Sequence, residues 1–168
     1  MIWDVLKRVF ARRNGRHRAL VVEDDPAFLA LIRNHLKTAG VKSTASDSCD
    51  EALELATQTP ERFSLFIFKK MVNGQSGFEL ARQIRMARGM AQIPILFLLD
   101  RGTEEELARL KRTFAHTQAM TKPFSGLQFV EGVKTALQTQ RRRRPIAKSS
   151  LRCKTPPPAR MRAREFDV

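Results

Sequence analysis

Five times in succession between residues 18 and 140, a short strand-like segment is followed by an amphipathic helical pattern. The strand-like segments are Ala19–Val22, Val41–Ala45, Phe63–Phe68, Ile93–Leu99 and Gln118–Thr121. A chain that alternates strand and helix in this way forms a parallel sheet with right-handed crossovers and helices on both faces. We therefore predict a doubly wound α/β domain of three layers. The more polar segment Val41–Ala45 is expected at an edge of the sheet.

The predicted helices carry their own start and stop signals. The N-terminal caps that we expect are Asp25, Ser48, Thr103 and Ser125. Pro26 is suited to the first helical position after Asp25, and Ser48 with Glu51 has the spacing of a capping box. Gly40 and Pro60 are expected to end the first two helices, and a third helix is predicted from Gly77 to Met86.

The net charge of +14 is distributed unevenly along the chain. Residues 1–18 contain six Lys or Arg against one acidic residue, and residues 138–168 contain ten against two. Residues 19–137 contain fifteen against fourteen, so a nearly neutral domain carries two basic arms. Such arms favour anionic partners, for example nucleic acid, an anionic lipid surface or an acidic protein face.

The two arms have different patterns. Residues 1–17 predict a basic amphipathic helix whose apolar face contains Ile2, Trp3, Leu6, Val9 and Phe10. This helix fits an anionic membrane or a partner's groove, and it equally fits packing on its own domain. Residues 141–168 are rich in Pro and Arg and are predicted to be disordered, because they have too little apolar surface to offset chain entropy. Their candidate polyanion-binding residues are Arg141, Arg142, Arg143 and Arg144.

The cysteine spacing and the hydropathy of the sequence indicate the cellular compartment in which the protein is expected. Cys49 and Cys153 have no metal-binding or redox spacing, which is typical of a reduced, cytoplasmic protein. No apolar run approaches the roughly 20 residues needed to span a bilayer. We therefore expect a cytoplasmic protein, with peripheral attachment to the inner face of the membrane left open by residues 1–17.

Three motifs at matching separations resemble the receiver domain of two-component response regulators, the CheY-like family. They are V-V-E-D-D-P after the first strand, G-F-E-L at the start of the third helix and K-P-F after the fifth strand. The resemblance covers residues 18–140. It implies a flavodoxin-like five-stranded parallel sheet in the order 2-1-3-4-5, and a cis peptide bond between Lys122 and Pro123.

In a working receiver, an aspartate at the end of the third strand accepts a phosphoryl group and an acidic pair holds Mg²⁺. A Ser or Thr after the fourth strand and a Lys after the fifth bind phosphate oxygens. Carried over to this chain, Glu23 and Asp24 match the acidic pair, and Lys122 matches the phosphate-binding lysine. The acceptor position, eight residues before the glycine of G-F-E-L, is Lys69, and the Ser/Thr position falls on Leu99.

These substitutions predict a degenerate receiver pocket of Glu23, Asp24, Lys69, Lys122 and Pro123, with no catalytic residue, metal or cofactor. The aromatic residue that usually switches before the lysine is replaced by Ala119 or Met120.

Because the ammonium of Lys69 could take the place of Mg²⁺, we hypothesise that Lys69 and Lys122 pair with Glu23 and Asp24. Two alternatives stay open. In the first alternative, Lys69 points into solvent. In the second, a displaced acceptor such as Asp24, Asp25 or Asp100 takes the phosphoryl group.

The resemblance favours a non-enzymatic, phosphorylation-independent signalling or scaffold module. Its expected protein partner is a signalling kinase, a regulator or a scaffold, bound through the surface of the fourth helix, fifth strand and fifth helix. The alternatives are a nucleic-acid- or polyanion-binding protein that uses the basic arms, and an adaptor anchored to a membrane surface by residues 1–17.

Overall fold

The computed structural model describes residues 17–59, 62–102 and 104–143. Five parallel strands form one sheet in the order β2-β1-β3-β6-β7. The strands are His17–Val22 (β1), Val41–Ser46 (β2), Leu65–Lys69 (β3), Ile95–Leu99 (β6) and Thr117–Thr121 (β7). The order is the predicted 2-1-3-4-5, since β4 (Met71–Val72) and β5 (Gln75–Ser76) form a separate two-residue hairpin. The flavodoxin-like fold is therefore confirmed.

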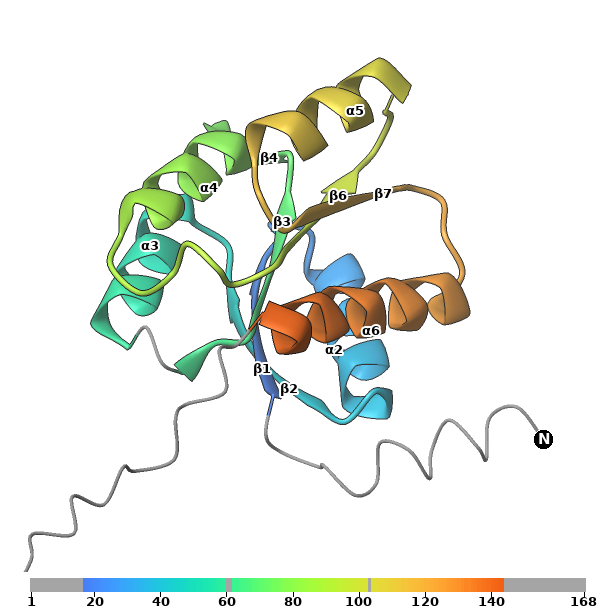
Figure 1. Ribbon diagram of the computed structural model, residues 1–168. Helices are drawn as coiled ribbons and strands as arrows, with labels where there is room; N and C mark the ends of the chain where they lie inside the picture. Colours follow the sequence, from blue (N-terminus) through green and yellow to red (C-terminus); the bar gives the residue numbers. More distant parts are fainter. Residues whose placement is uncertain (1–16, 60–61, 103, 144–168) are drawn as a thin grey trace, which may run out of the picture.

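Helices cover both faces of the sheet (Figure 1). The helices are Pro26–Thr38 (α2), Cys49–Gln58 (α3), Gly77–Met86 (α4), Glu104–Thr113 (α5) and Gly126–Arg143 (α6). α2 and α6 pack on one face, and α3, α4 and α5 pack on the other. Each face has its own apolar core.

The apolar run of β3 shows why the sheet is buried on both sides. Successive residues of a strand point to opposite faces. Phe66 and Phe68 therefore pack toward α3, α4 and α5, while Leu65 and Ile67 pack toward α2 and α6. All four side chains are fully buried, as expected for a central strand of a parallel sheet.

The predicted caps have mixed outcomes. Asp25 accepts hydrogen bonds from the Ala27 and Phe28 amides, and Ser125 forms a reciprocal capping box with Gln128. The capping box predicted for Ser48 and Glu51 is wrong, because the Ser48 side chain makes no capping bond. Glu51 instead accepts a hydrogen bond of 2.6 Å from Ser46, a buried residue at the end of β2.

Several expectations fall on residues outside the described part of the chain. They are the helix in residues 1–17, except for His17 itself, the cap at Thr103 and the tail from residue 144. α6 runs to Arg143, past the boundary that we expected after residue 140. Within the described residues, no helix is both long and apolar enough to cross a membrane.

Candidate functional site

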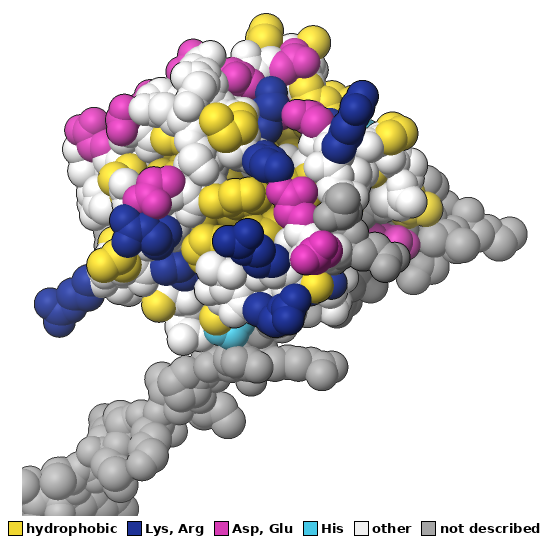
Figure 2. Space-filling view, turned by 90° about the horizontal axis from the view of Figure 1, so that it is seen from above, with side chains coloured by type: hydrophobic (Ala, Val, Ile, Leu, Met, Phe, Trp, Pro, Cys, Tyr) yellow, Lys and Arg dark blue, Asp and Glu magenta, His cyan; other side chains and the backbone are white. Residues whose placement is uncertain are grey.

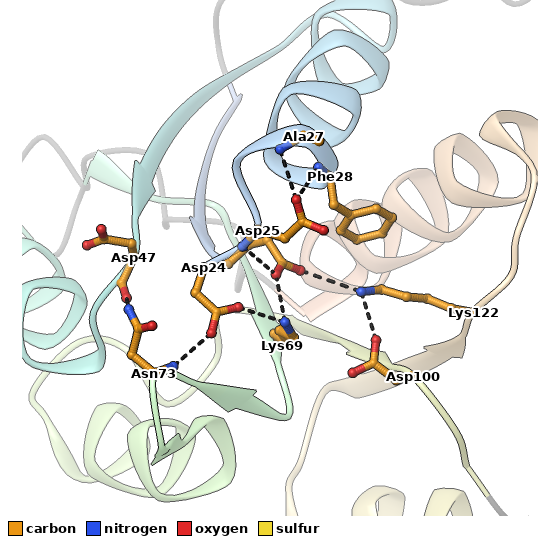
Figure 3. Close-up of polar contacts among 10 residues, drawn as sticks. Asp24, Asp25, Ala27, Phe28, Asp47, Lys69, Asn73, Asp100 and Lys122 are labelled. Carbon is orange, nitrogen blue, oxygen red and sulfur yellow. Dashed lines mark hydrogen bonds and ion pairs between the residues drawn. The ribbon is translucent and has the colours of Figure 1, made fainter.

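Charged side chains gather at the carboxyl ends of four neighbouring strands (Figure 3). Glu23 and Asp24 follow β1, Lys69 ends β3, Asp100 follows β6 and Lys122 follows β7. Ligand and catalytic sites of open α/β sheets lie at this edge. The fold therefore brings together the five charged residues of the candidate site.

Lys69 lies between the two carboxylates of the acidic pair. Its Nζ is 3.1 Å from Glu23 Oε1 and 2.6 Å from Asp24 Oδ1. The Glu23 side chain is fully buried, and only 18% of the Lys69 side chain is exposed. Lys69 therefore does not point into solvent, and both contacts that the sequence suggested for it are present.

The Asp24 carboxylate is held from two directions. Besides the contact with Lys69, its Oδ2 accepts a hydrogen bond of 2.8 Å from the Asn73 amide. The hydrogen bond from Lys69, followed by that from Asn73, lowers the pKa of Asp24 to about 2. Burial by itself would lower the pKa of Lys69, but its hydrogen bonds to Asp24 and Glu23 outweigh burial and raise that pKa. Both groups are charged at neutral pH.

Lys122 contacts one of its two predicted partners and two groups that we did not predict. Its Nζ is 2.9 Å from Asp100 Oδ1, 3.6 Å from Glu23 Oε2 and 3.8 Å from the centre of the Phe28 ring. The contact with Glu23 is as expected, whereas the pairing with Asp24 is wrong. The oxygens of Asp24 accept from Lys69 and Asn73, and the carboxylate nearest to the Lys122 Nζ is that of Asp100.

Two backbone features position Lys69 and Asp24. A Cβ atom at Gly77 would lie 2.0 Å from the Lys69 carbonyl oxygen, so only glycine allows this approach between α4 and the end of β3. Asn73 has a positive φ of 46° in the turn between β4 and β5, which directs its amide toward Asp24. The Asn73 side chain also donates to the Asp47 carbonyl. Residues 73 and 74, Asn-Gly, are the sequence signal for this turn.

The family model of the response regulator receiver domain matches residues 19–134 of this chain. The chain belongs to this receiver family. Receiver domains are signalling modules that interact with kinases and other regulators.

Curated relatives agree with this assignment. The phosphate regulon transcriptional regulatory protein PhoB of Rhizobium meliloti is 35% identical over 135 residues, which cover 79% of this chain and 56% of that protein. The heme response regulator HssR of Staphylococcus aureus is 27% identical over 123 residues, which cover 72% of this chain and 51% of HssR. The chain thus spans about half the length of these relatives.

Solved structures show the same fold. The chemotaxis response regulator CheY4 of Vibrio cholerae superposes with a TM-score of 0.65 at 24% identity, covering 72% of this chain and 98% of CheY4. A putative response regulator from Chloroflexus aurantiacus gives the same TM-score and identity, with 73% and 98% covered.

The Mg²⁺ that a receiver holds does not fit the residues of this pocket. The Lys69 ammonium is within hydrogen-bonding distance of both carboxylates that would bind the metal, and it would repel a divalent cation. Within residues 17–59, 62–102 and 104–143, no group of three or more His, Cys, Asp or Glu could hold a metal ion.

The remaining receiver positions are also accounted for. Leu99 is fully buried at the end of β6 and offers no hydroxyl to a phosphate. The Lys122–Pro123 peptide bond is cis, as the resemblance implies. Ala119 and Met120 are half-buried in β7 at the position of the missing aromatic. Arg141, Arg142 and Arg143 belong to the last turn of α6, and Arg144 lies outside the described residues, so their polyanion role stays a prediction.

The other acidic residues of this edge have structural roles. Asp25 caps α2 through its Oδ1, and Asp24 and Asp100 are each paired with a lysine. Besides the contacts of Lys122 with Asp100 and of Asn73 with Asp24, two more were not anticipated from the sequence. Lys122 lies over the Phe28 ring, and Lys70 pairs with Glu106 of α5.

Proposed function

We propose that this receiver domain works without phosphorylation, as a protein-interaction module held in one conformation. The observation that carries the proposal is the position of the Lys69 ammonium between Glu23 and Asp24. An ammonium cannot form the acyl phosphate that a carboxylate forms, and it excludes the divalent cation on which phosphoryl transfer depends. Leu99 removes a further ligand for phosphate oxygens.

Two ion pairs supply the connections that a phosphoryl group would otherwise have to make. Lys70, next to Lys69, pairs with Glu106 and so links the end of β3 to α5. Lys122 pairs with Asp100 and so links the end of β7 to the segment between β6 and α5. The first pair acts on α5 and the second on β7, and both elements belong to the expected partner surface. Both pairs form without a phosphoryl group, so the surface they hold does not depend on an upstream kinase.

The surface near α5 fits a protein partner. β7 is an edge strand, and α5 and α6 both pack against it. Figure 2 shows apolar, basic and acidic side chains interspersed on the face above α4 and α5. A groove between these helices has Phe78, Leu110 and Phe114 among its apolar residues, and charged residues of both signs beside them. Mixed charge around apolar surface is typical of protein interfaces.

The decisive experiment is incubation of the full chain with a small phosphodonor and Mg²⁺, followed by intact-mass measurement. We expect no mass gain for the wild type. The double variant Lys69→Asp/Leu99→Thr restores the acceptor and the hydroxyl, and we expect it to gain one phosphoryl group. A phosphoryl gain on the wild-type protein would contradict the proposal, and peptide mapping would then identify the acceptor, with Asp100 the first to examine.

A second candidate function rests on the distribution of charge, with two basic arms on a nearly neutral domain. In this case the chain binds nucleic acid or another polyanion through residues 141–168, or a membrane surface through residues 1–17. Deleting residues 141–168 separates this candidate from the first, because binding through the receiver surface survives both the deletion and high salt. Vesicle flotation of the wild type against Trp3→Glu tests the membrane route.

A further inference from the structure

A second concave surface lies at the amino ends of β1 and β2, at the opposite edge of the sheet from Lys69. Three elements contribute to it: the start of β1, the last turns of α2 and the start of β2. Its lining residues are Arg18, Arg33, Asn34, Lys37, Gly40, Val41, Lys42 and Ser43. Its volume is about 740 Å³, within the roughly 300–1,000 Å³ that is usual for small-molecule sites.

This basic pocket has an unbalanced charge. Four of its eight lining residues are cations, and none of the described residues that line it is acidic. None of the four cations that line the pocket takes part in a described ion pair. The cations of those pairs are Lys69, Lys70, Arg82 and Lys122. A concave surface lined by one sign of charge concentrates the opposite charge from solution.

Helix stability accounts for only part of this pattern. Lys37 lies in the last turn of α2, where a cation is favourable beside the helix dipole. Arg33 is four residues earlier on the same face of α2, and like charges at this spacing are destabilising. Arg18 and Lys42 come from two different strands, so no single element explains why all four cations converge.

We propose that the basic pocket binds a phosphate-bearing anion, either a soluble oligophosphate or the headgroup of an anionic phospholipid. Both ligands present the same phosphate oxygens, which guanidinium groups such as those of Arg18 and Arg33 can bind in a bidentate manner. No aromatic residue is among the described lining residues, so the pocket offers no stacking platform for bases. A phosphate group therefore fits better than single-stranded nucleic acid. The inference is independent of the Lys69 site.

The position of the pocket in the chain supports this ligand class. Arg18 follows directly after the basic segment 1–17, which joins the domain at this edge of the sheet. The cations of that segment are Lys7, Arg8, Arg12, Arg13 and Arg16. The sequence thus carries five further cations shortly before the pocket residue Arg18.

The test uses the full chain and inorganic triphosphate as the soluble probe. We expect triphosphate to shift the backbone amide signals of Gly40, Val41 and Lys42 in an NMR titration. The double variant Arg33→Gln/Lys37→Gln changes two exposed side chains, and we expect it to weaken binding roughly tenfold, so that the same amide shifts need about ten times more triphosphate. The matched control is Lys111→Gln/Arg112→Gln on α5, which removes the same charge from exposed positions and should retain both the shifts and the affinity.

A parallel arm of the experiment uses vesicles of phosphatidylglycerol, with phosphatidylcholine as the neutral control. Selective loss of triphosphate binding in the pocket variant supports a soluble ligand, and selective loss of flotation with phosphatidylglycerol supports a lipid headgroup. Equal weakening in the pocket and control variants, or unchanged pocket amides, overturns the proposal, because binding then depends on overall charge. Selective loss of binding to a single-stranded oligonucleotide alone also overturns it.

Discussion

Replacing Lys69 with Met isolates the charge of the ion-pair cluster. Methionine keeps most of the length and apolar volume of the lysine side chain, so the substitution removes the ammonium without opening a large cavity. Glu23, whose side chain is fully buried, then keeps a hydrogen bond from the Asp25 amide and the Lys122 ammonium at 3.6 Å. Asp24 keeps the hydrogen bond from the Asn73 amide.

The size of the effect follows from these remaining contacts. Removing one partner of a buried ion pair lowers the free energy of unfolding by about 3–5 kcal/mol. A pKa of Asp24 lowered from 3.8 to about 2 corresponds to about 2 kcal/mol of stabilisation, which Lys69 shares with Asn73. The Asp24 side chain is 22% exposed, so water relieves part of the loss. We therefore expect Lys69→Met to lower the free energy of unfolding by about 2–4 kcal/mol.

Urea unfolding at neutral pH measures this loss, and the adjacent lysine provides a matched control. Lys70 pairs with Glu106, but 42% of its side chain is exposed. An exposed pair contributes about 0.2–1 kcal/mol, so Lys70→Met should have a small effect. A loss for Lys69→Met below about 1 kcal/mol, or no larger than that for Lys70→Met, would refute the argument from the buried ion pair.

The pH dependence gives the same experiment a second readout. Because the pKa of Asp24 is lower in the folded state than its usual 3.8, its contribution is complete above about pH 4 and is lost as the pH falls toward 2. The pKa of Lys69 is raised above its usual 10.5, so its contribution is complete below that pH and is lost above it. The stability difference between wild type and Lys69→Met should therefore be constant near neutral pH and decrease in acid.

Three further outcomes are expected. Arg85→Lys should cost about 2–3 kcal/mol in urea unfolding, because the guanidinium donates to four backbone carbonyls in two loops and an ammonium cannot reach them all. Gly77→Ala should lower Tm much more than Gly74→Ala. A Cβ at Gly77 would lie 2.0 Å from a carbonyl oxygen, whereas one at Gly74, despite its positive φ, meets no atom within 4 Å. Adding Mg²⁺ should leave the Tm of the wild type unchanged and raise the Tm of Lys69→Asp, because this variant has a third carboxylate beside Glu23 and Asp24. A Mg²⁺-dependent rise in the Tm of the wild type would contradict the role given to Lys69.

The backbone of the site could be predicted from the sequence in two ways. Alternating strand and helix patterns predict the doubly wound parallel sheet, and the resemblance to the receiver family implies the strand order and, through the eight-residue spacing to Gly77, the place of Lys69 at the end of β3. The partners of the long side chains were harder to predict. Lys122 and Glu51 each have a flexible stem that reaches several polar groups, so Asp100 and Ser46 became their partners through distances that the sequence does not encode. Arg85 was missed because no pattern marks an arginine that binds loop carbonyls.

Asp100 and Lys69 are best understood as two parts of one change. In the receiver pattern, the position of Lys69 is held by the acceptor carboxylate, so Lys69 stands for one anion fewer and one cation more at this edge of the sheet. Lys122 would then be left with Glu23 alone, at 3.6 Å. Asp100, at the end of the neighbouring strand, returns one negative charge at 2.9 Å from Lys122. Because 63% of its side chain is exposed, this pair adds little stability. Its effect is local, because it gives Lys122 a second carboxylate partner beside Glu23.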